Sequence, residues 1–247
     1  MRLFFPFATV LRAWGCLLAV GGMPLTGVCA AELQSFHALY TVRTAGLEVG
    51  QLERRLTLAP AGHYRFASDL RPTGLAALLR DAGEAEISEG EINANEVRPL
   101  DYTFLRHAGG KHKSQKVRFD RRDGKALFSD KAGSTALIFR GRVLDKLSYQ
   151  LALMRDLSHA TTALDYVVAD DRQLRSYHLQ RVGEETVAIQ NRAVIAQKIV
   201  YARAGTQRQT TLWCAAEYGY LPVKIAYQDE HGKVTVATLI PSPTASP

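Results

Sequence analysis

The sequence predicts a mainly β protein: an antiparallel, strongly curved open barrel (half-barrel) with one helix near 143–157 packed against it. Apolar and polar side chains alternate with a period of two residues through most of the chain, which is the pattern of half-buried strands. Short turn-forming segments separate these runs, and only one long stretch has helical spacing. A sheet of this many strands must curl or close to protect its edges. We favour the open form, with a closed barrel as the alternative.

Two pairs of strands are clearest. In the first pair, residues 51–58 and 63–70 alternate in the same way and are joined by Ala59-Pro60-Ala61-Gly62, which predicts a hairpin. In the second pair, residues 221–227 and 234–238 flank a turn at 229–232 and predict a closing antiparallel hairpin. Further strands are predicted at residues 36–43, 84–92, 99–107, 112–120, 124–129, 163–169, 172–181, 192–203 and 207–214.

One segment departs from this two-residue rhythm. Its apolar residues recur at intervals of three and four and fit one face of a helix; they are Val143, Leu144, Leu147, Leu151, Met154 and Leu157. We therefore expect a helix near 143–157 that lies against the concave face of the sheet as a plug or lid. A shorter apolar run at 75–79 predicts a single helical turn or a loop packed on the sheet.

The N-terminus predicts export from a bacterial cytoplasm. Arg2 and Arg12 precede an uncharged stretch at 13–31, and Val28-Cys29-Ala30 offers the small residues that a signal peptidase accepts. We expect a signal peptide at 1–30 and a periplasmic mature protein that is not an integral membrane protein. An uncleaved anchor is the alternative, and it would also place residues 32 onward outside the cytoplasm.

The mature chain is expected to form a single domain at 31–240, which is long enough for a substantial core, followed by a disordered tail at 241–247. Cleavage removes Cys16 and Cys29 and leaves Cys214, so no internal disulfide can form. It also lowers the 31 basic residues to 29 against 24 acidic ones, which changes the formal charge from +7 to +5. This weakly basic balance does not indicate nucleic-acid binding.

No residue pattern in the sequence indicates a catalytic, metal or cofactor site. Cys214 follows Trp213 in a predicted strand, and nothing assigns a histidine to it as a base. His107 and His112 flank two glycines and could meet across a tight hairpin. Two ligands do not make a zinc site, which needs three or four, so a solvated turn is the simpler interpretation.

Acidic pairs mark one predicted strand. Glu84 with Glu86, and Glu89 with Glu91, lie two residues apart and would share a strand face. A glycoside hydrolase places two carboxylates at a comparable separation. Carboxylates at alternate positions of an exposed strand are nevertheless ordinary, so we interpret them as a solvent-facing stripe.

Basic residues gather on the next predicted hairpin, where they alternate in part with apolar ones. Such a cluster could bind phosphate or sulfate groups, and half of it also fits the solvated face of an ordinary hairpin. The residues of this hypothetical anion-binding surface are Arg106, Lys111, Lys113, Lys116 and Arg118.

Several short pieces, taken in order, resemble the family known as domain of unknown function 3108, which is found in exported bacterial proteins. They are Tyr40 with Gly46 and Gly50, Pro72-Thr73-Gly74-Leu75, Ser88-Glu89-Gly90, Pro99-Leu100-Asp101-Tyr102, Asp145, Trp213 and Leu221-Pro222-Val223-Lys224. The resemblance spans nearly the whole mature chain, with no match at 183–198. It implies a curved sheet similar to the half-barrels of periplasmic lipoprotein carriers, which hold acyl chains in an apolar concavity. It implies no activity and no ligand residues.

The leading functional hypothesis is a non-enzymatic binding or carrier module for an apolar or amphiphilic envelope molecule such as a lipid. Its hypothetical ligand groove comprises Tyr40, Phe66, Tyr102, Phe104, Leu147, Leu151, Met154, Trp213 and Tyr227, although aromatic residues on strands belong to the core more often than to ligand sites. The alternative is an envelope scaffold that binds an anionic glycan or an envelope protein. A hydrolase of envelope polymers is a third hypothesis.

Overall fold

The computed structural model describes residues 33–74, 77, 82–93 and 96–241. The expected signal peptide at 1–30, most of the apolar run at 75–79 and nearly all of the expected tail at 241–247 lie outside these residues. The structure therefore describes most of the predicted domain at 31–240, but not the segments on either side that would define its boundaries. Within the described residues, no helix is both long enough and apolar enough to cross a membrane.

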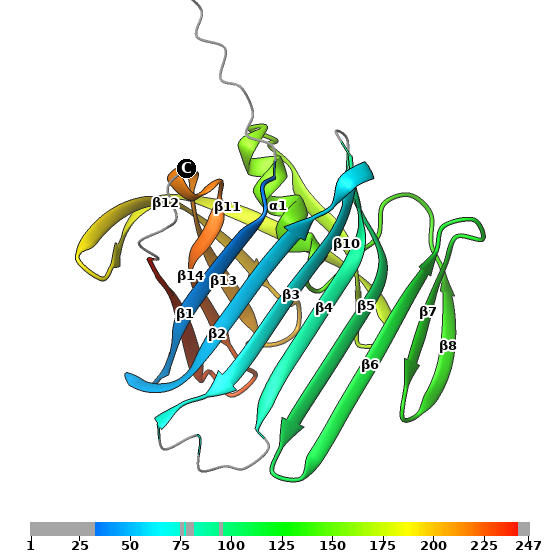
Figure 1. Cartoon of the computed structure of the whole chain (residues 1–247), viewed down its shortest axis with the longest axis horizontal. Helices are drawn as coiled ribbons and strands as arrows, with labels where there is room; N and C mark the ends of the chain where they lie inside the picture. The colour runs from blue at the N-terminus through cyan, green and yellow to red at the C-terminus, as the bar shows by residue number, and fades with distance from the viewer. Residues whose placement is uncertain (1–32, 75–76, 78–81, 94–95, 242–247) are drawn as a thin grey trace, which may run out of the picture.

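Fifteen strands form one sheet in the described part of the chain, and the sheet bends into an open barrel (Figure 1). Its strand order is β8-β7-β6-β5-β4-β3-β2-β1-β15-β14-β13-β12-β11-β10-β9. The strands are β1 (Phe36–Thr44), β2 (Leu47–Leu58), β3 (His63–Pro72), β4 (Gly83–Ile92), β5 (Val97–Ala108), β6 (Lys111–Asp120), β7 (Lys125–Asp130), β8 (Gly133–Ile138), β9 (Leu144–Asp145), β10 (Leu164–Asp170), β11 (Gln173–Ile189), β12 (Arg192–Ala202), β13 (Gln209–Ala215), β14 (Leu221–Gln228) and β15 (Val234–Ile240).

The sheet is a meander in which strands that follow each other in sequence usually pair. The main exception joins the two ends of the chain: β1 pairs with β15, so that Val42 lies opposite Ala237. Backbone bulges interrupt the register of several pairs, for example between Val42 and Arg43, and bulges increase local twist. The sheet curves strongly without closing, because β8 and β9 are the last strands of the ladder at its two ends.

The prediction of an antiparallel, strongly curved open barrel is confirmed, with one local departure. The two-residue strand β9 runs parallel to β10 and pairs Leu144 with Val168. Two strands also differ from the sequence-based expectation. The sequence predicted no strand at 133–138, where the structure has β8, and β11 continues to Ile189 rather than ending near residue 181.

Helix α1 spans Ser148–Ser158 and lies inside the curve of the sheet, at one end of the barrel (Figure 1). The predicted start at residue 143 was wrong, because Leu144 and Asp145 form β9 and the segment up to Leu147 is not helical. Nearly the whole helix is buried, including the polar residues Ser148, Gln150 and Asp156. Two short 3₁₀ turns, η1 (Pro60–Gly62) and η3 (Ala216–Tyr218), complete the described helices.

Candidate functional site

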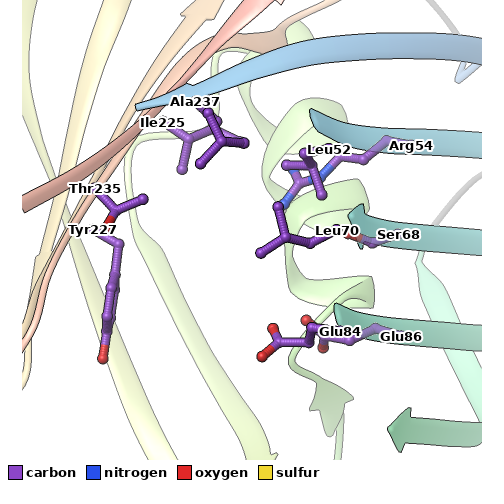
Figure 2. Close-up of a pocket in the computed structure, with 11 residues that line it drawn as sticks. Leu52, Arg54, Ser68, Leu70, Glu84, Glu86, Ile225, Tyr227, Thr235 and Ala237 are labelled. Carbon is purple, nitrogen blue, oxygen red and sulfur yellow. The ribbon is translucent and has the colours of Figure 1, made fainter. Parts of the chain in front are cut away.

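A pocket lies inside the barrel between β2–β4 on one side and β14–β15 on the other, towards the end of the barrel at which β1 and β3 finish (Figure 2). The strands place it there, because β1 and β3 run towards this end and β2 and β4 begin at it. Its volume is about 150 Å³. The pocket is lined by Val42, Leu52, Arg54, Ser68, Leu70, Glu84, Glu86, Ile225, Tyr227, Thr235 and Ala237.

The register of three neighbouring strands builds one wall of this pocket in two rows. In the outer row Leu52 of β2 lies opposite Leu70 of β3, which lies opposite Glu84 of β4. In the inner row Ser68 lies between Arg54 and Glu86 in the same way. Side chains at alternate positions point to the same face of a sheet, so both rows face the interior of the barrel. The outer row is therefore apolar on β2 and β3, the inner row is polar on these two strands, and both rows are acidic on β4.

The opposite wall comes from the other end of the chain. Ile225 and Tyr227 of β14 project towards the pocket beside Thr235 and Ala237 of β15 (Figure 2). Tyr227 is 44% exposed and stands at the mouth. This wall carries no charge, so an apolar group in the pocket would contact carbon atoms on two sides.

Arg54 forms the floor of the pocket, next to the helix. Only 7% of its surface is exposed. Its Nη1 donates to Oε1 of Gln150 in α1 at 2.5 Å, and its guanidinium lies 5.9 Å from the centroid of the Tyr40 ring. Its buried Nε has no hydrogen-bond partner. Arg54 thus separates the filled end of the barrel from the hollow end.

Glu84 and Glu86 are half-buried in the pocket instead of forming the solvent-facing stripe that we expected. Burial, followed by repulsion from Glu86, raises the pKa of Glu84. The Tyr102 hydroxyl donates to Glu86, and Arg106 lies 3.9 Å from Glu84. Both carboxylates come from one strand and one wall, so they do not flank a bound group as the paired carboxylates of a glycosidase do.

A second polar cluster is buried at the helix end and fastens α1 to the sheet. Tyr64 donates to Ser88 at 2.9 Å, and Ser88 donates to Asp145 Oδ2 at 2.6 Å. Asp145 Oδ1 accepts the backbone N–H groups of Leu147 and Ser148 at 2.8 and 2.7 Å. Asp145 is fully buried, so this cluster is structural and offers no access to a ligand.

The structure places eight of the nine predicted groove residues in the packed core. Each of these eight is at most 8% exposed, which leaves little surface for a ligand; they are Tyr40, Phe66, Tyr102, Phe104, Leu147, Leu151, Met154 and Trp213. Tyr227 alone among the nine lines the pocket. The groove that the sequence suggested beside the helix is thus filled by the helix itself.

The five basic residues of the hypothetical anion-binding surface do not share one face. Residues opposite each other in the β5–β6 hairpin point to the same side, and Arg106 lies opposite Lys113 on the concave side, with Lys111 on the same parity. Lys116 and Arg118 have the other parity and lie on the convex side, where Arg118 contacts Asp101 at 3.2 Å. The single basic surface that we expected is therefore divided.

The hairpin does bring His107 and His112 together, with ring centroids 4.6 Å apart. Among the described residues, however, no group of three or more His, Cys, Asp or Glu side chains is arranged to hold a metal ion. Cys214 borders a second hollow of about 350 Å³, which is lined by residues of β11, β12 and β13 and of the η3 turn. The thiol is buried, and burial raises its pKa, which disfavours the nucleophilic thiolate.

Arg54 is the pocket residue that the sequence analysis missed, and the sequence did contain a signal for it. Leu52 and Leu56 define the apolar parity of β2, and Arg54 stands between them on that same parity. A charged residue at a core-facing position is uncommon unless it is paired or functional. Ile225, Thr235 and Ala237 of the opposite wall could not be inferred, because the pairing of β15 with β1 that brings them there joins opposite ends of the chain, such as Val42 and Ala237.

Comparison with known proteins agrees with the sequence resemblance and the fold. No curated protein matches the sequence. A crystal structure described as a β-barrel-like protein of domain of unknown function DUF1849, from Brucella abortus, is similar with a TM-score of 0.51 and 10% sequence identity, over 83% of this chain and 95% of that chain. This likeness concerns the fold alone. The profile of the family described as protein of unknown function (DUF3108) matches residues 39–239, and the chain belongs to this family.

Proposed function

We propose that the protein is a non-enzymatic binding or carrier module that holds an apolar or amphiphilic molecule in the pocket at the open end of the barrel. The observation that carries this proposal is the composition of the pocket. Leu52, Leu70, Ile225 and Ala237 offer apolar surface on two walls, and Arg54 offers a polar group at the floor. Ligand sites typically combine a mostly apolar lining with a few polar groups that fix orientation.

The size of the pocket limits what it can enclose. A cavity of about 150 Å³ with apolar walls holds a group the size of benzene. A longer chain would extend past Tyr227 at the mouth, where the barrel is open. Burial contributes roughly 25 cal/mol for each Å² of apolar surface removed from water, so a partly enclosed chain supports modest affinity and ready release. A carrier needs both properties.

Native mass spectrometry of protein purified from the periplasm tests the proposal directly. We expect a bound species that organic solvent extracts and that is amphiphilic or apolar. The Leu70→Trp variant should fill the pocket and lose this species. Leu105→Trp on the convex face of β5, where Leu105 is 40% exposed, is the matched control and should retain it. Wild-type protein that carries no such molecule and binds none when offered would overturn the proposal.

We also propose that the protein works in the periplasm, because residues 1–30 have the pattern of a cleaved signal peptide. N-terminal sequencing of protein from a periplasmic extract should begin at Ala31. A full-length chain in the cytoplasmic fraction would contradict this proposal. The scaffold alternative has less support, because the five basic residues lie on two faces of the sheet; it would predict a salt-sensitive complex with an anionic glycan or an envelope protein.

A further inference from the structure

The charge of Arg54 has no counter-ion in the described part of the protein. Its side chain is more than nine-tenths buried, yet no carboxylate there lies within 4.0 Å of its guanidinium. Its guanidinium donates a hydrogen bond to the neutral amide of Gln150. Nε is buried without any partner. The remaining face of the guanidinium borders the pocket (Figure 2).

This arrangement is unusual on physical grounds. A guanidinium keeps its proton in proteins, so Arg54 cannot escape the cost of burial by becoming neutral. Buried charges are normally paired, because a low-dielectric interior solvates a lone charge poorly. The aromatic ring of Tyr40 offsets part of this cost. A full offset requires an anion, and the pocket is the direction from which an anion can approach.

The two acidic residues of the pocket do not fill this role. Glu86 accepts the hydroxyl of Tyr102, and Glu84 lies near Arg106. Both carboxylates also interact electrostatically with Lys146, whose ammonium lies 4.8 Å from the centroid of the Phe104 ring. Arg106 and Lys146 thus compensate the negative charge of the acidic wall, and neither carboxylate pairs with Arg54.

Building on the proposed function, we infer that Arg54 binds the anionic group of the ligand, a carboxylate or a phosphate monoester at the end of a single apolar chain. The planar guanidinium matches either group, since both present paired oxygen atoms to its N–H donors. The first part of the chain would lie against Leu52 and Leu70 on one side and Ile225 on the other, and would leave the pocket past Tyr227. The amphiphile therefore enters with its charged end first.

A series of probes that share one chain tests this inference on the wild-type protein. Octanoate, octyl phosphate, octanol and octylamine are titrated below their micelle concentrations by isothermal calorimetry. We expect octanoate or octyl phosphate to bind about tenfold or more tightly than octanol, which is the effect of one hydrogen bond to a charged group, and octylamine to bind most weakly. Comparison of the two anions identifies which one the pocket prefers.

The outcomes separate this inference from the proposed function. Equal affinity for all four probes would overturn the role of Arg54 while leaving the pocket as an apolar binding site. No binding of any probe would overturn both. Tighter binding of octylamine than of octanoate would show that the acidic wall recognises the head group, which also contradicts the inference.

Two substitutions make the assignment specific to the residue. Arg54→Gln should abolish the preference for the anions, and Arg54→Lys should keep part of it, because a lysine retains the charge and loses the planar fork. The matched control is Arg55→Gln, which removes the same charge from the same strand on the exposed convex face; its preference should equal that of the wild type. An Arg54→Gln protein that still prefers octanoate would overturn the inference.

Discussion

At the residue scale, Asp145 shows how a buried carboxyl group can connect the elements of a fold. Its two carboxylate oxygens accept hydrogen bonds from Ser88 on β4 and from two backbone N–H groups at the start of α1. These bonds replace the water that the carboxylate loses on burial. Removal of one partner would leave the others buried and unsatisfied, which costs roughly 1–3 kcal/mol for each group.

The first prediction concerns the pH dependence of stability. Burial raises the pKa of Asp145 from 3.8 to about 6, against the opposing effect of its hydrogen bonds. Between these two values the folded protein binds more protons at this site than the unfolded chain does. The contribution of Asp145 to the free energy of unfolding is therefore greatest below pH 3.8 and is lost as the pH rises through about 6. A shift of about two pKa units corresponds to roughly 3 kcal/mol.

Urea unfolding of the wild type and of Asp145→Asn between pH 4 and pH 8 measures this contribution. The variant lacks the titrating group, so the difference between the two free energies of unfolding should move in favour of the variant as the pH rises. The total change should approach about 3 kcal/mol. Two parallel pH profiles would contradict the raised pKa of Asp145.

The second prediction concerns Cys214, which is fully buried. Burial raises the pKa of its thiol, so both access and thiolate formation are suppressed. We expect no reaction with a thiol reagent in the folded mature protein and one equivalent in urea. The thermal midpoint should be the same with and without a reductant. Rapid labelling of the folded protein would show that the segment β13–η3 opens locally.

At the scale of the elements, helix α1 acts as the core of one end of the barrel. Leu151 is fully buried against the inner face of the sheet. The third prediction is that Leu151→Ala lowers the free energy of unfolding by about 2–5 kcal/mol, because it leaves a cavity in a packed interior. Leu127→Ala on the exposed face of β7, where Leu127 is 38% exposed, should cost much less. Equal losses in the two variants would show that the helix end is loosely packed.

The sequence predicted most strands correctly, and its errors have physical causes. Apolar spacing continued from residue 143 into the helix because Val143, Leu144 and Leu147 are buried too. Burial alone does not reveal that the Asp145 side chain caps the backbone and delays the helix start. Strand β8 was not predicted because it lies at the edge of the sheet and most of its residues are exposed. Its sequence therefore lacks the alternation of apolar and polar residues that marks a half-buried strand.

The candidate site was harder to predict than the fold, for a different reason. Alternation identifies which residues face inward, but it does not say which part of the interior is filled. Helix α1 occupies the end that contains Phe66 and Leu151, and leaves hollow the end that contains Leu70 and Tyr227. Which end is filled depends on where the connection between β8 and β10, which contains α1, enters the barrel. No local sequence pattern encodes that position.

At the scale of the whole molecule, no backbone ladder joins the two ends of the sheet in the described part of the chain, and side chains bridge the open side instead. The turn between β10 and β11 reaches across to β6, β7 and β8. Arg172 contacts Asp130 Oδ1 at 2.7 Å, donates to the Gly133 carbonyl at 3.0 Å and donates to Thr135. Lys113 lies 3.4 Å from Asp171 in the same turn. Backbone pairing closes the rest of the sheet, so this seam is its weakest join.

Positive φ angles at both turn residues aim these side chains across the seam. Asp171 and Arg172 have φ values of 47° and 61°, a conformation that glycine and asparagine adopt more readily. The turn therefore keeps two charged residues in a conformation that costs them backbone energy. Their contacts with the far end of the sheet offset that cost, which indicates that the seam contributes to the stability of the barrel.

The fourth prediction is that Arg172→Ala opens the seam while the remainder of the barrel stays folded. Amide hydrogen exchange should rise in β8, which is the edge strand of the sheet, and in its neighbour β7, and should stay unchanged in β1, β2 and β15. The Lys113→Ala variant should have a smaller effect, because its ion pair is more exposed and such pairs contribute about 0–1 kcal/mol. If Arg172→Ala accelerated exchange equally in all strands, the barrel would unfold as one unit, which would contradict local opening of the seam. If exchange rose in β7 and β8 alone, the open side could loosen without loss of the pocket, and a bound chain could leave sideways as well as through the mouth.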